Sequence, residues 1–324
     1  MESSAHPALN SATRVLVVDP LHREALERLE SRFEVTVRLR PSDAELRRLI
    51  GDAEVLVMRS GIQLTAEAIG AARALRLVAR AGVGVDNIDL AAAKRAGVRV
   101  FNVPAQSATS VAEFALALAL ALTRRIPLAA AQVRRNEWRK PELVGDELQD
   151  ATMGVVGLGA IGSLIAARAR GFQMRVLANV GRPTPRRRRD LAGEGVELVD
   201  LDELLREADV VCLAVPLTES TCGLLAAREL ELMGPRSYLV NVSRAGVVDE
   251  ADLHAALADG RLAGAALDVV ASEGEATPLA ELDNVVVTPH IGAMTDQAQR
   301  RVGEIVVSSI LSGLDGGRLA NQVC

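Results

Sequence analysis

Short apolar runs alternate with amphipathic stretches along the first third of the chain. Apolar runs of about four residues predict buried strands, whereas apolar positions that recur every three to four residues predict helices. A regular alternation of the two indicates a parallel sheet covered by helices. The strands are expected at residues 15–18, 34–37, 55–58, 77–79 and 99–101, and the helices at 23–31, 43–50 (with Ser42 as N-cap) and 65–72.

The rest of the chain repeats this alternation after one long helical stretch, about residues 110–131. Ser110 lies three residues before Glu113, which is the spacing of a capping box, so this helix is expected to begin there and to link two domains. A final helix, about 296–311, has no strand of its own in the second series, so we expect it to return and pack on the first unit. The second series of strands is expected at 153–156, 175–177, 196–199, 210–215, 238–242, 264–267 and 285–288.

A glycine fingerprint follows the first strand of this second series. The sequence Gly157-Leu158-Gly159-Ala160-Ile161-Gly162 leads from the apolar run 153–156 into a helical pattern, which is the context in which GxGxxG binds a dinucleotide. The glycines allow a tight turn, a close approach of the backbone to the pyrophosphate, and close packing of the helix on the strand. Because the fingerprint begins only at residue 157, another unit must precede it.

Composition limits the class of protein. At 324 residues the chain exceeds the usual size of one hydrophobic core, so two domains are expected. Hydrophobic residues make up 49% and charged residues 24%, which is typical of a soluble globular protein. A net charge of −5 and an aromatic content of 2% argue against nucleic-acid binding. Cys212, Cys222 and Cys324 have no metal-binding or redox spacing, so no metal site is expected.

The N-terminal residues and the most apolar stretch of the chain bear on its location in the cell. Residues 1–13 are polar and lack the cationic start and apolar run of a signal peptide, so we expect a disordered tail. The stretch 114–122 is short for a membrane span and is followed by Arg124-Arg125, which predicts a packed helix. We therefore expect a cytoplasmic protein with no membrane partner.

Polar residues follow the later strands at the points where those strands end. Arg244 comes after the strand at 238–242, Asp268 and Glu273 after 264–267, and His290 after 285–288. Ligands of open parallel sheets bind outside the carboxyl ends of the strands, so these side chains are expected to converge on one cleft. Asp268 has an alternative role as a cap for the turn after its strand.

These residue types suit hydride transfer to a 2-oxo acid. The reaction needs a guanidinium that binds the substrate carboxylate bidentately, a proton donor for the forming alkoxide, and a carboxylate that orients and supports that donor. Arg244, His290 and Glu273 match the three roles, with Glu275 as a rival of Glu273 in the same polar loop.

Taken in order, the motifs at 80–89, 157–162, 241–246, 268–273 and 288–292 resemble the D-isomer-specific 2-hydroxyacid dehydrogenase family, and most of all its phosphoglycerate-type members. The resemblance extends over nearly the whole chain after the tail. It implies an α/β fold with two doubly wound parallel-sheet domains. A Rossmann NAD(P)-binding domain, 105–292, is inserted into a discontinuous flavodoxin-like substrate-binding domain, 14–104 and 293–324. It also implies a homodimer formed through the nucleotide domains, and catalysis by Arg244, Glu273 and His290.

The same resemblance assigns residues to the two ligands. The residues expected at the dinucleotide are Gly157, Gly159, Ala160, Ile161, Gly162, Arg182, Val215, Val242, Asp268 and Gly292. The residues expected at the 2-hydroxy or 2-oxo acid are Arg59, Ser60, Arg80, Gly82, Val83 and Arg139, with Arg139 supplied by the partner subunit. Three of these are arginines, which suits a dianionic group on the substrate.

Two positions depart from the family pattern. NAD-using members carry an acidic residue at the end of the second strand of the nucleotide unit, where this chain has Val180. A carboxylate there would repel the 2′-phosphate of NADP(H). Its absence, together with Arg182 and the arginine run 186–189, favours NADP(H), with NAD(H) possible. The second departure is Gly274, which replaces the proline that usually follows the glutamate and alters the turn that aims Glu273.

Alternatives remain for the substrate and for the class of function. The arginines favour a 3-phosphoglycerate-like substrate. However, Ala105-Gln106-Ser107 stands where the family more often has Asn-Gly-Asn, which favours a different acid. One alternative is an NADPH-dependent glyoxylate or hydroxypyruvate reductase. Another, from a different class, is a corepressor that senses a dinucleotide without turnover. The sequence ends at Cys324, so no C-terminal regulatory domain is expected.

Overall fold

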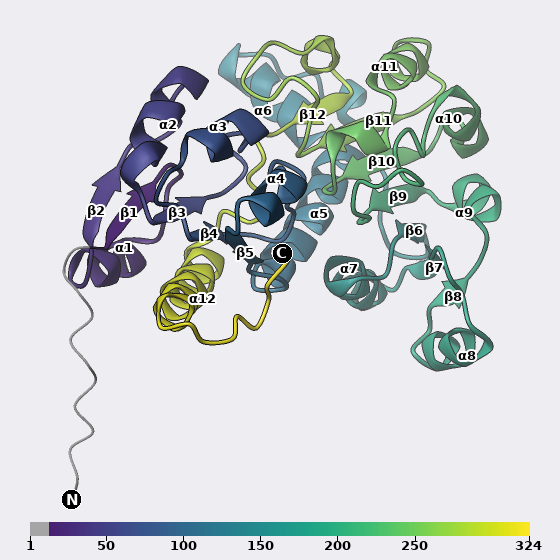
Figure 1. Cartoon of the computed structure of the whole chain (residues 1–324). Coiled ribbons are helices and arrows are strands. Elements are labelled where there is room, and N and C mark those ends of the chain that lie inside the picture. Colours follow the sequence, from purple (N-terminus) through teal and green to yellow (C-terminus); the bar gives the residue numbers. More distant parts are fainter. Residues whose placement is uncertain (1–12) are drawn as a thin grey trace, which may run out of the picture. The chain divides into compact units, whose positions relative to one another are not determined.

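The computed structural model describes residues 13–324, which form two compact units. The first unit consists of the chain up to Ser107 together with Met294–Cys324, and the second unit is Ala108–Ala293. Each unit is built on one parallel sheet, so the predicted fold class is confirmed, with the second unit inserted into the chain of the first (Figure 1). Of the predicted tail, residues 1–12 lie outside the described part of the chain.

The sheet of the first unit has five parallel strands in the order β2-β1-β3-β4-β5. This is the flavodoxin-like order, in which the strand sequence reverses direction beside β1. Strands β3 and β4 are buried along their whole length, as inner strands of a parallel sheet covered on both faces must be. The strands are β1 (Arg14–Val17), β2 (Glu34–Val37), β3 (Val55–Met58), β4 (Leu77–Arg80) and β5 (Arg99–Asn102).

Helices cover both faces of this sheet. Helix α12 packs against α1 and β4 and buries Val306, Val307 and Ile310 in the same apolar cluster as Val57 and Leu77. The last helix therefore completes the first unit, as its isolated position in the sequence predicted. The helices of this unit are α1 (Arg23–Glu30), α2 (Asp43–Leu49), α3 (Ala66–Ala71), α4 (Leu90–Arg95) and α12 (Asp296–Leu314), with a 3-10 turn η1 (Ile50–Asp52).

Side-chain caps explain where two of these helices begin. Ser42 accepts a hydrogen bond from the Glu45 N–H, as predicted for an N-cap. Asp89 likewise accepts from the Ala92 N–H at the start of α4. Helix α4 was not among the predicted helices.

The sheet of the second unit has seven parallel strands in the order β12-β11-β10-β9-β6-β7-β8. Counted from β6 as the first strand, this is the Rossmann order with one further strand, β12, at the edge. The order reverses between β6 and β9, and dinucleotides bind at such a switch point. The strands are β6 (Thr152–Val156), β7 (Arg175–Asn179), β8 (Glu197–Leu198), β9 (Val210–Leu213), β10 (Tyr238–Asn241), β11 (Gly264–Leu267) and β12 (Val285–Val287).

Two apolar clusters lie on the two faces of this sheet. One contains residues of α5 and α7, and the other contains residues of α9, α10 and α11 (Figure 1). The helices are α5 (Ala108–Thr123), α6 (Ile126–Arg134), α7 (Ala160–Gly171), α8 (Pro185–Gly193), α9 (Leu201–Glu207), α10 (Ala227–Met233) and α11 (Glu250–Ala258), with 3-10 turns η2 (Lys140–Leu143), η3 (Ala245–Val247) and η4 (Pro278–Glu281).

The prediction of one helix from 110 to 131 is wrong. Helix α5 starts two residues earlier, so Ser110 lies inside it and is not an N-cap, and the helix ends at Thr123. Pro127 has no N–H to donate to the Thr123 carbonyl, and its ring would collide with that carbonyl in a continuous helix. The Thr123 carbonyl accepts the Asp146 N–H instead, at 2.9 Å, and Arg125 adopts a left-handed conformation with φ of 51°.

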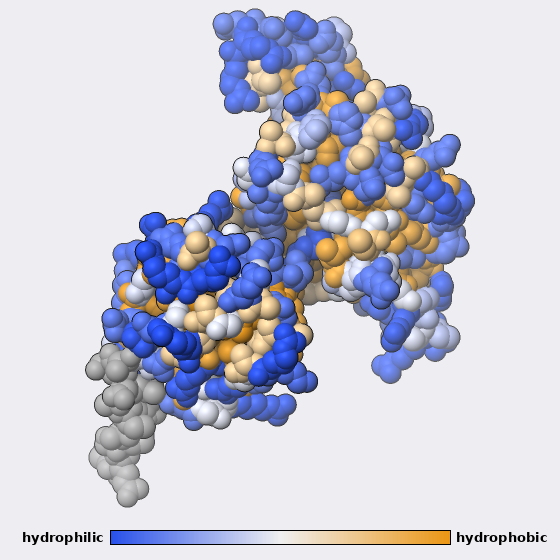
Figure 2. Space-filling view, turned by 45° about the horizontal axis from the view of Figure 1, so that its top comes forward, coloured by the Kyte–Doolittle hydropathy of each residue, from blue (hydrophilic) through white to orange (hydrophobic). Residues whose placement is uncertain are grey.

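Within residues 13–324, no single helix has the length and apolar character needed to cross a membrane. Helices α5 and α6 reach that length and composition only together, as a pair bent by 62°. Figure 2 shows hydrophilic side chains over most of the surface in view, with apolar side chains in small groups between them.

Candidate active site

The glycine-rich loop joins β6 to α7. The space that a side chain would meet differs at each of its three glycines. Gly157 has a φ of 95°, and a Cβ there would lie 2.7 Å from the Ala214 carbonyl oxygen and from Val215. A Cβ on Gly162 would lie 1.8 Å from the Gly157 carbonyl oxygen, so α7 can approach β6 this closely only at a glycine. A Cβ on Gly159 would meet nothing within 4 Å. The loop therefore has an open side at Gly159.

The start of α7 suits an anion. Gly159 is the N-cap, and Ala160 and Ile161 begin the helix. The N–H groups of a first helical turn have no carbonyl acceptor in the helix, and the helix dipole adds positive potential at that end. An open backbone position beside a helix N-terminus is what the pyrophosphate of a dinucleotide needs, so the loop fits this cofactor.

Three more residues expected at the dinucleotide lie near the same edge of the sheet. Val215 follows β9 and lies against the backbone of Gly157. Val242 follows β10 and is buried in the apolar cluster below α5 and α7. Gly292 donates its N–H to Asp268, and a Cβ at this position would lie 2.9 Å from the Asp268 carboxylate.

The end of β7 is the position at which an acidic residue would bind the ribose. Asn179 donates its side-chain N–H to the Val199 carbonyl, and Val180 packs on the apolar cluster. Arg182 follows and is exposed. The strand end thus presents an amide, an apolar side chain and a guanidinium.

The arginine run 186–189 lies in α8, and its members have different partners. Arg186 pairs with a carboxylate one turn along the helix, and Arg188 donates to the Leu198 carbonyl in β8. Arg187 donates to the Leu158 carbonyl at 3.0 Å. Arg187 therefore brings a positive charge to the glycine-rich loop itself.

Arg244 follows β10 in a loop that Asn241 holds. The buried Asn241 side chain accepts from the N–H and the hydroxyl of Ser243, at 3.0 and 2.7 Å, and donates to the Arg244 carbonyl at 2.9 Å. The Arg244 guanidinium donates to the Ser243 carbonyl. The sequence analysis missed Asn241, although an asparagine two residues before a serine is a recognisable turn signal.

Asp268 follows β11 and binds the turn that carries His290. It is 3% exposed. One carboxylate oxygen accepts from the Thr288 hydroxyl at 2.7 Å and the Ile291 N–H at 2.8 Å, and the other accepts from the Gly292 N–H at 2.8 Å. The turn that Asp268 holds thus follows the neighbouring strand β12, and is not the turn after its own strand that the sequence left open as an alternative. A contact of Asp268 with the cofactor stays a prediction.

His290 and Glu273 form a hydrogen-bonded pair. The Nδ1 atom of His290 lies 2.8 Å from Oε1 of Glu273, with the two side chains 30% and 45% exposed. Glu275, the rival, uses its N–H inside the turn, bonding the Ser272 carbonyl. The aim of Glu273 at His290 is kept despite Gly274, whose φ of 93° a proline could not adopt. Since β10, β11 and β12 are neighbours, Arg244 lies on the same sheet edge.

In the first unit, Arg59 follows β3 and is held on two sides. Its N–H donates to the buried Asp19 carboxylate at 2.6 Å, and its guanidinium donates to the Gln299 side-chain oxygen at 2.8 Å. Burial lowers the pKa of Arg59 from its ordinary value, and the nearby Asp19 carboxylate partly opposes that shift. Ser60, the next residue, is exposed.

The loop after β4 contains the other substrate candidates of this unit. The Arg80 side chain is 7% exposed and lies against Gly82, where a Cβ would be 1.7 Å from the guanidinium. Gly82 donates its N–H to the Arg80 carbonyl, so this donor is used inside the loop. Asn102 donates to the Val83 carbonyl at 2.6 Å, and Val83 is exposed. The Val83 amide is therefore a better candidate than Gly82 for binding an anion.

Arg139 lies in the second unit, on the segment after α6. It is exposed and pairs with Glu137 at 3.3 Å and with Glu142 at 3.8 Å. Large apolar side chains around this segment are also exposed. They are Ile126, Val133, Trp138 and Val144.

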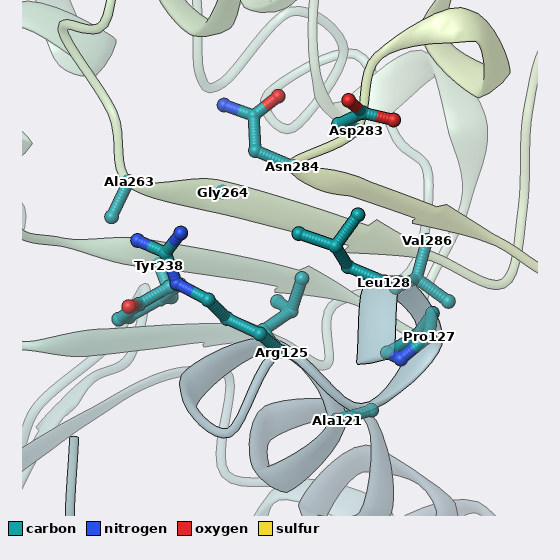
Figure 3. Close-up of a pocket in the computed structure, with 11 residues that line it drawn as sticks. Ala121, Arg125, Pro127, Leu128, Tyr238, Ala263, Gly264, Asp283, Asn284 and Val286 are labelled. Atoms are coloured by element: carbon teal, nitrogen blue, oxygen red, sulfur yellow. The ribbon is translucent and has the colours of Figure 1, made fainter. Parts of the chain in front are cut away.

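A partly enclosed cavity of about 120 Å³ lies at the opposite, amino edge of the same sheet (Figure 3). Tyr238 and Gly264, the first residues of β10 and β11, line it together with Arg125 and Asp283. Burial, and then the Asp146 carboxylate bonded to its hydroxyl, raise the pKa of Tyr238. Because ligands of parallel sheets bind at the carboxyl edge, we do not assign this cavity to the active site. No group of three or more His, Cys, Asp or Glu side chains within residues 13–324 could hold a metal ion.

Comparison with known proteins identifies the family of the chain. Residues 116–292 match the model of the D-isomer specific 2-hydroxyacid dehydrogenase family, NAD binding domain. A D-3-phosphoglycerate dehydrogenase of Methanocaldococcus jannaschii is 42% identical over 313 residues, which are 96% of this chain and 59% of the relative. The chain thus spans 59% of the length of that curated relative.

Two other proteins match over almost their full length. A hydroxypyruvate reductase of Thermotoga maritima is 41% identical over 307 residues, which are 93% of this chain and 98% of the relative. The structure of D-lactate dehydrogenase from Aquifex aeolicus, complexed with NAD and lactic acid, superposes with a TM-score of 0.85 at 30% identity, covering 96% of this chain and 99% of that one. The resemblance read from the motifs is confirmed, and the chain belongs to the D-isomer-specific 2-hydroxyacid dehydrogenase family.

Proposed function

We propose that the chain is an NAD(P)-dependent oxidoreductase that interconverts a D-2-hydroxy acid and the corresponding 2-oxo acid. The observation that carries the proposal is the 2.8 Å hydrogen bond between His290 and Glu273, on the sheet edge that also carries Arg244. Membership of a dehydrogenase family with an NAD-binding domain supports it.

Each of the three side chains has one task in this reaction. Arg244 binds the substrate carboxylate through its guanidinium and polarises the adjoining carbonyl. His290 donates a proton to the carbonyl oxygen during reduction and takes it back during oxidation. Glu273 accepts the Nδ1–H of His290, which fixes the tautomer and leaves Nε2 for the substrate. When bound, the nicotinamide supplies or accepts the hydride.

The dinucleotide would be held by the glycine-rich loop and the sheet edge beside it. The N–H groups at the start of α7 and the open side of Gly159 suit its pyrophosphate. Asp268 acts through the turn that it caps, because its two oxygens accept three hydrogen bonds from residues 288–292.

We also propose a preference for NADP(H). Three observations support it: Val180 stands where a repelling carboxylate would be, Arg182 is exposed beside it, and Arg187 lies on the glycine-rich loop. The test is kcat/KM with NADPH and with NADH. Arg187→Ala should raise KM for NADPH about 10-fold while leaving NADH unchanged, since a charge-assisted contact is worth roughly 1.5–3 kcal/mol. Arg186→Ala is the matched control, because Arg186 pairs along the helix. A higher kcat/KM with NADH in the wild type would contradict the preference.

The substrate proposed is a 3-phosphoglycerate-like acid. Arg59, Arg80 and Arg139 suit a dianionic group, with Arg139 contributed by a partner subunit, and Val83 and Ser60 supply polar groups. Arg59 supports this best, because Asp19 and Gln299 hold its backbone and its guanidinium. The hydroxypyruvate reductase among the relatives favours a non-phosphorylated acid as a second candidate.

We propose a homodimer formed through the second unit, in the cytoplasm. The exposed apolar side chains around α6, with Trp138 at 74%, support a contact surface there, since large apolar groups in one place are unusual on a monomer. Sedimentation at several concentrations tests the dimer. Replacing Trp138 and Val144 by serine should weaken it, whereas serine at the exposed Val37 of the first unit should not.

The experiment that tests the function is a substrate panel. Reduction of 3-phosphohydroxypyruvate, hydroxypyruvate, glyoxylate and 2-oxoglutarate is followed by nicotinamide absorbance with NADH and NADPH. Turnover of at least one acid is expected. Cofactor binding without turnover of any acid would support the rival function, a corepressor that senses the dinucleotide. The complete arginine, glutamate and histidine set argues against that rival, because a sensor does not need it.

A further inference from the structure

The loop that carries Glu273 is tied to a neighbouring helix by a side chain with no task in the proposed reaction. Glu250 is the first residue of α11, and its Oε1 accepts a hydrogen bond from the Ala271 N–H at 2.6 Å. Ala271 lies two residues before Glu273. A bond this short to an ionised carboxylate belongs to the stronger class of hydrogen bonds.

Glu250 stands on a firmly held part of the second unit. The residue before it, Asp249, caps α11 by accepting two N–H groups of the first turn, each at 3.0 Å. The Asp249 N–H donates to the Leu225 carbonyl at 2.9 Å, next to the β-bridge between Leu225 and Val248. Since Leu225 and Val248 are buried, the start of α11 is fixed in the core of the unit.

The Glu273 loop has less support of its own. Val269 and Val270 are buried, but residues 271–276 lie at the surface, before the chain is buried again at Thr277. The bond from the Glu275 N–H to the Ser272 carbonyl closes the turn without attaching it to the sheet. Gly274, with its φ of 93°, adds a residue of high conformational freedom at the tip.

We propose that Glu250 is a positioning residue that aims Glu273 at His290, a role that rests on the proposed function. It fixes the start of the loop at Ala271, so that the Glu273 carboxylate stays within hydrogen-bond distance of the ring. The three side chains of the site then each have an anchor. Asn241 holds the loop of Arg244, Asp268 holds the turn of His290, and Glu250 holds the loop of Glu273.

Kinetics of three variants test the role. Glu250→Ala should lower kcat about 10-fold with KM for both substrates within twofold, because a small misplacement of a catalytic group mainly slows the chemical step. Glu250→Gln should restore most of kcat, since its amide oxygen still accepts the Ala271 N–H. Glu203→Ala is the matched control. It removes an exposed first-turn acid from α9 and should leave kcat unchanged.

A double variant separates positioning from a general loss of structure. In Glu273→Gln, adding Glu250→Ala should cause almost no further loss of kcat, because the aim of the carboxylate no longer matters. Additive losses, or a Glu250→Ala enzyme with wild-type kcat, would overturn the proposal.

A readout without turnover keeps this test apart from that of the proposed function. In ¹⁵N-histidine NMR of the wild type, His290 should be protonated at Nδ1, and Glu250→Ala should shift it towards a mixture of tautomers. An unchanged His290 signal in Glu250→Ala would overturn the role of Glu250. A wild type with this signal but no turnover would count only against the proposed reaction.

Discussion

Two turns at neighbouring strand ends hold the two halves of the His290–Glu273 pair in different ways. The turn of His290 is bonded to Asp268, a carboxylate that is 3% exposed, through one hydroxyl and two N–H groups. The turn of Glu273 lies at the surface and is bonded at its start to the side chain of Glu250. The turn of His290 is therefore anchored to a buried carboxylate, while the turn of Glu273 is anchored to a partly exposed one.

The difference has an energetic consequence. A buried carboxylate that accepts three hydrogen bonds contributes to folding, because its loss leaves three donors without that acceptor. A surface pair is screened by water and contributes little to folding. Loss of the Asp268 carboxylate should thus affect stability and turnover together, whereas loss of the Glu273 charge should affect turnover alone.

The largest effect is expected for Asp268→Ala. Removing the acceptor of the Thr288 hydroxyl and of two N–H groups should lower the free energy of unfolding by roughly 3–5 kcal/mol, as for other buried charged partners. Turnover should fall at least 100-fold as the turn of His290 loosens. Urea unfolding and steady-state kinetics measure the two quantities. A loss of less than 1 kcal/mol would show that the turn does not depend on Asp268.

Glu273→Gln should separate the two effects. The amide keeps the size of the side chain but removes the charge that supports a protonated ring, so kcat should fall about 100-fold. The free energy of unfolding should stay within about 0.5 kcal/mol of the wild type, because the pair is partly exposed. If Glu273→Gln lost several kcal/mol of unfolding free energy, the two turns would not differ in their contribution to stability.

A smaller effect is expected for Gly274→Ala. A non-glycine residue at a φ of 93° is strained, so unfolding should become easier by about 1–2 kcal/mol, with kcat reduced a few-fold. Gly171→Ala, at the end of α7, is the matched control, because a Cβ there would meet nothing within 4 Å, and it should be neutral or slightly stabilising. An equal change in the free energy of unfolding for both variants would mean that a side chain at position 274 does not strain the Glu273 turn.

The smallest effect is expected for the reactivity of two thiols, one in the core and one at the surface. Burial in β9 raises the pKa of Cys212 from 9.0 to about 12, whereas Cys222 lies in an exposed turn. At pH 8 a thiol reagent should modify Cys222 quickly and Cys212 only after unfolding. Since folding holds the Cys212 proton more tightly, its contribution to stability is complete below pH 9 and is lost as the pH rises towards 12. Cys212→Ala should flatten that alkaline fall in unfolding free energy. Rapid labelling of Cys212 at pH 8 would contradict its burial.

Most of the fold could be predicted from the sequence because the signal for a strand lies in the residues of the strand itself. The apolar runs 55–58 and 264–267 coincide with the buried strands β3 and β11. The alternating residues 34–37 coincide with β2, a largely exposed strand at the edge of its sheet. The break in the long helix was missed although Pro127 signals it in the sequence. What has no local signal is the distant Asp146 N–H, which takes the Thr123 carbonyl.

The residues of the candidate site also divide into those that the sequence reveals and those that it does not. Arg244, Glu273 and His290 are visible because chemically reactive residues follow strand ends in sequence. Their anchors are harder to see, since Glu250 meets a backbone N–H 21 residues away and Asp268 meets one 23 residues away. Backbone donors are present at every residue but proline, so no residue type marks which of them a distant carboxylate will bind.

The most direct test of the account is the turnover of His290→Ala with the best acid of the panel. We predict a fall in kcat of at least about 1,000-fold, within the range that general acid catalysis supplies, with unchanged affinity for the reduced dinucleotide. Near-wild-type turnover in this variant would contradict the assignment of His290 as the proton donor and, with it, the reaction proposed for this chain.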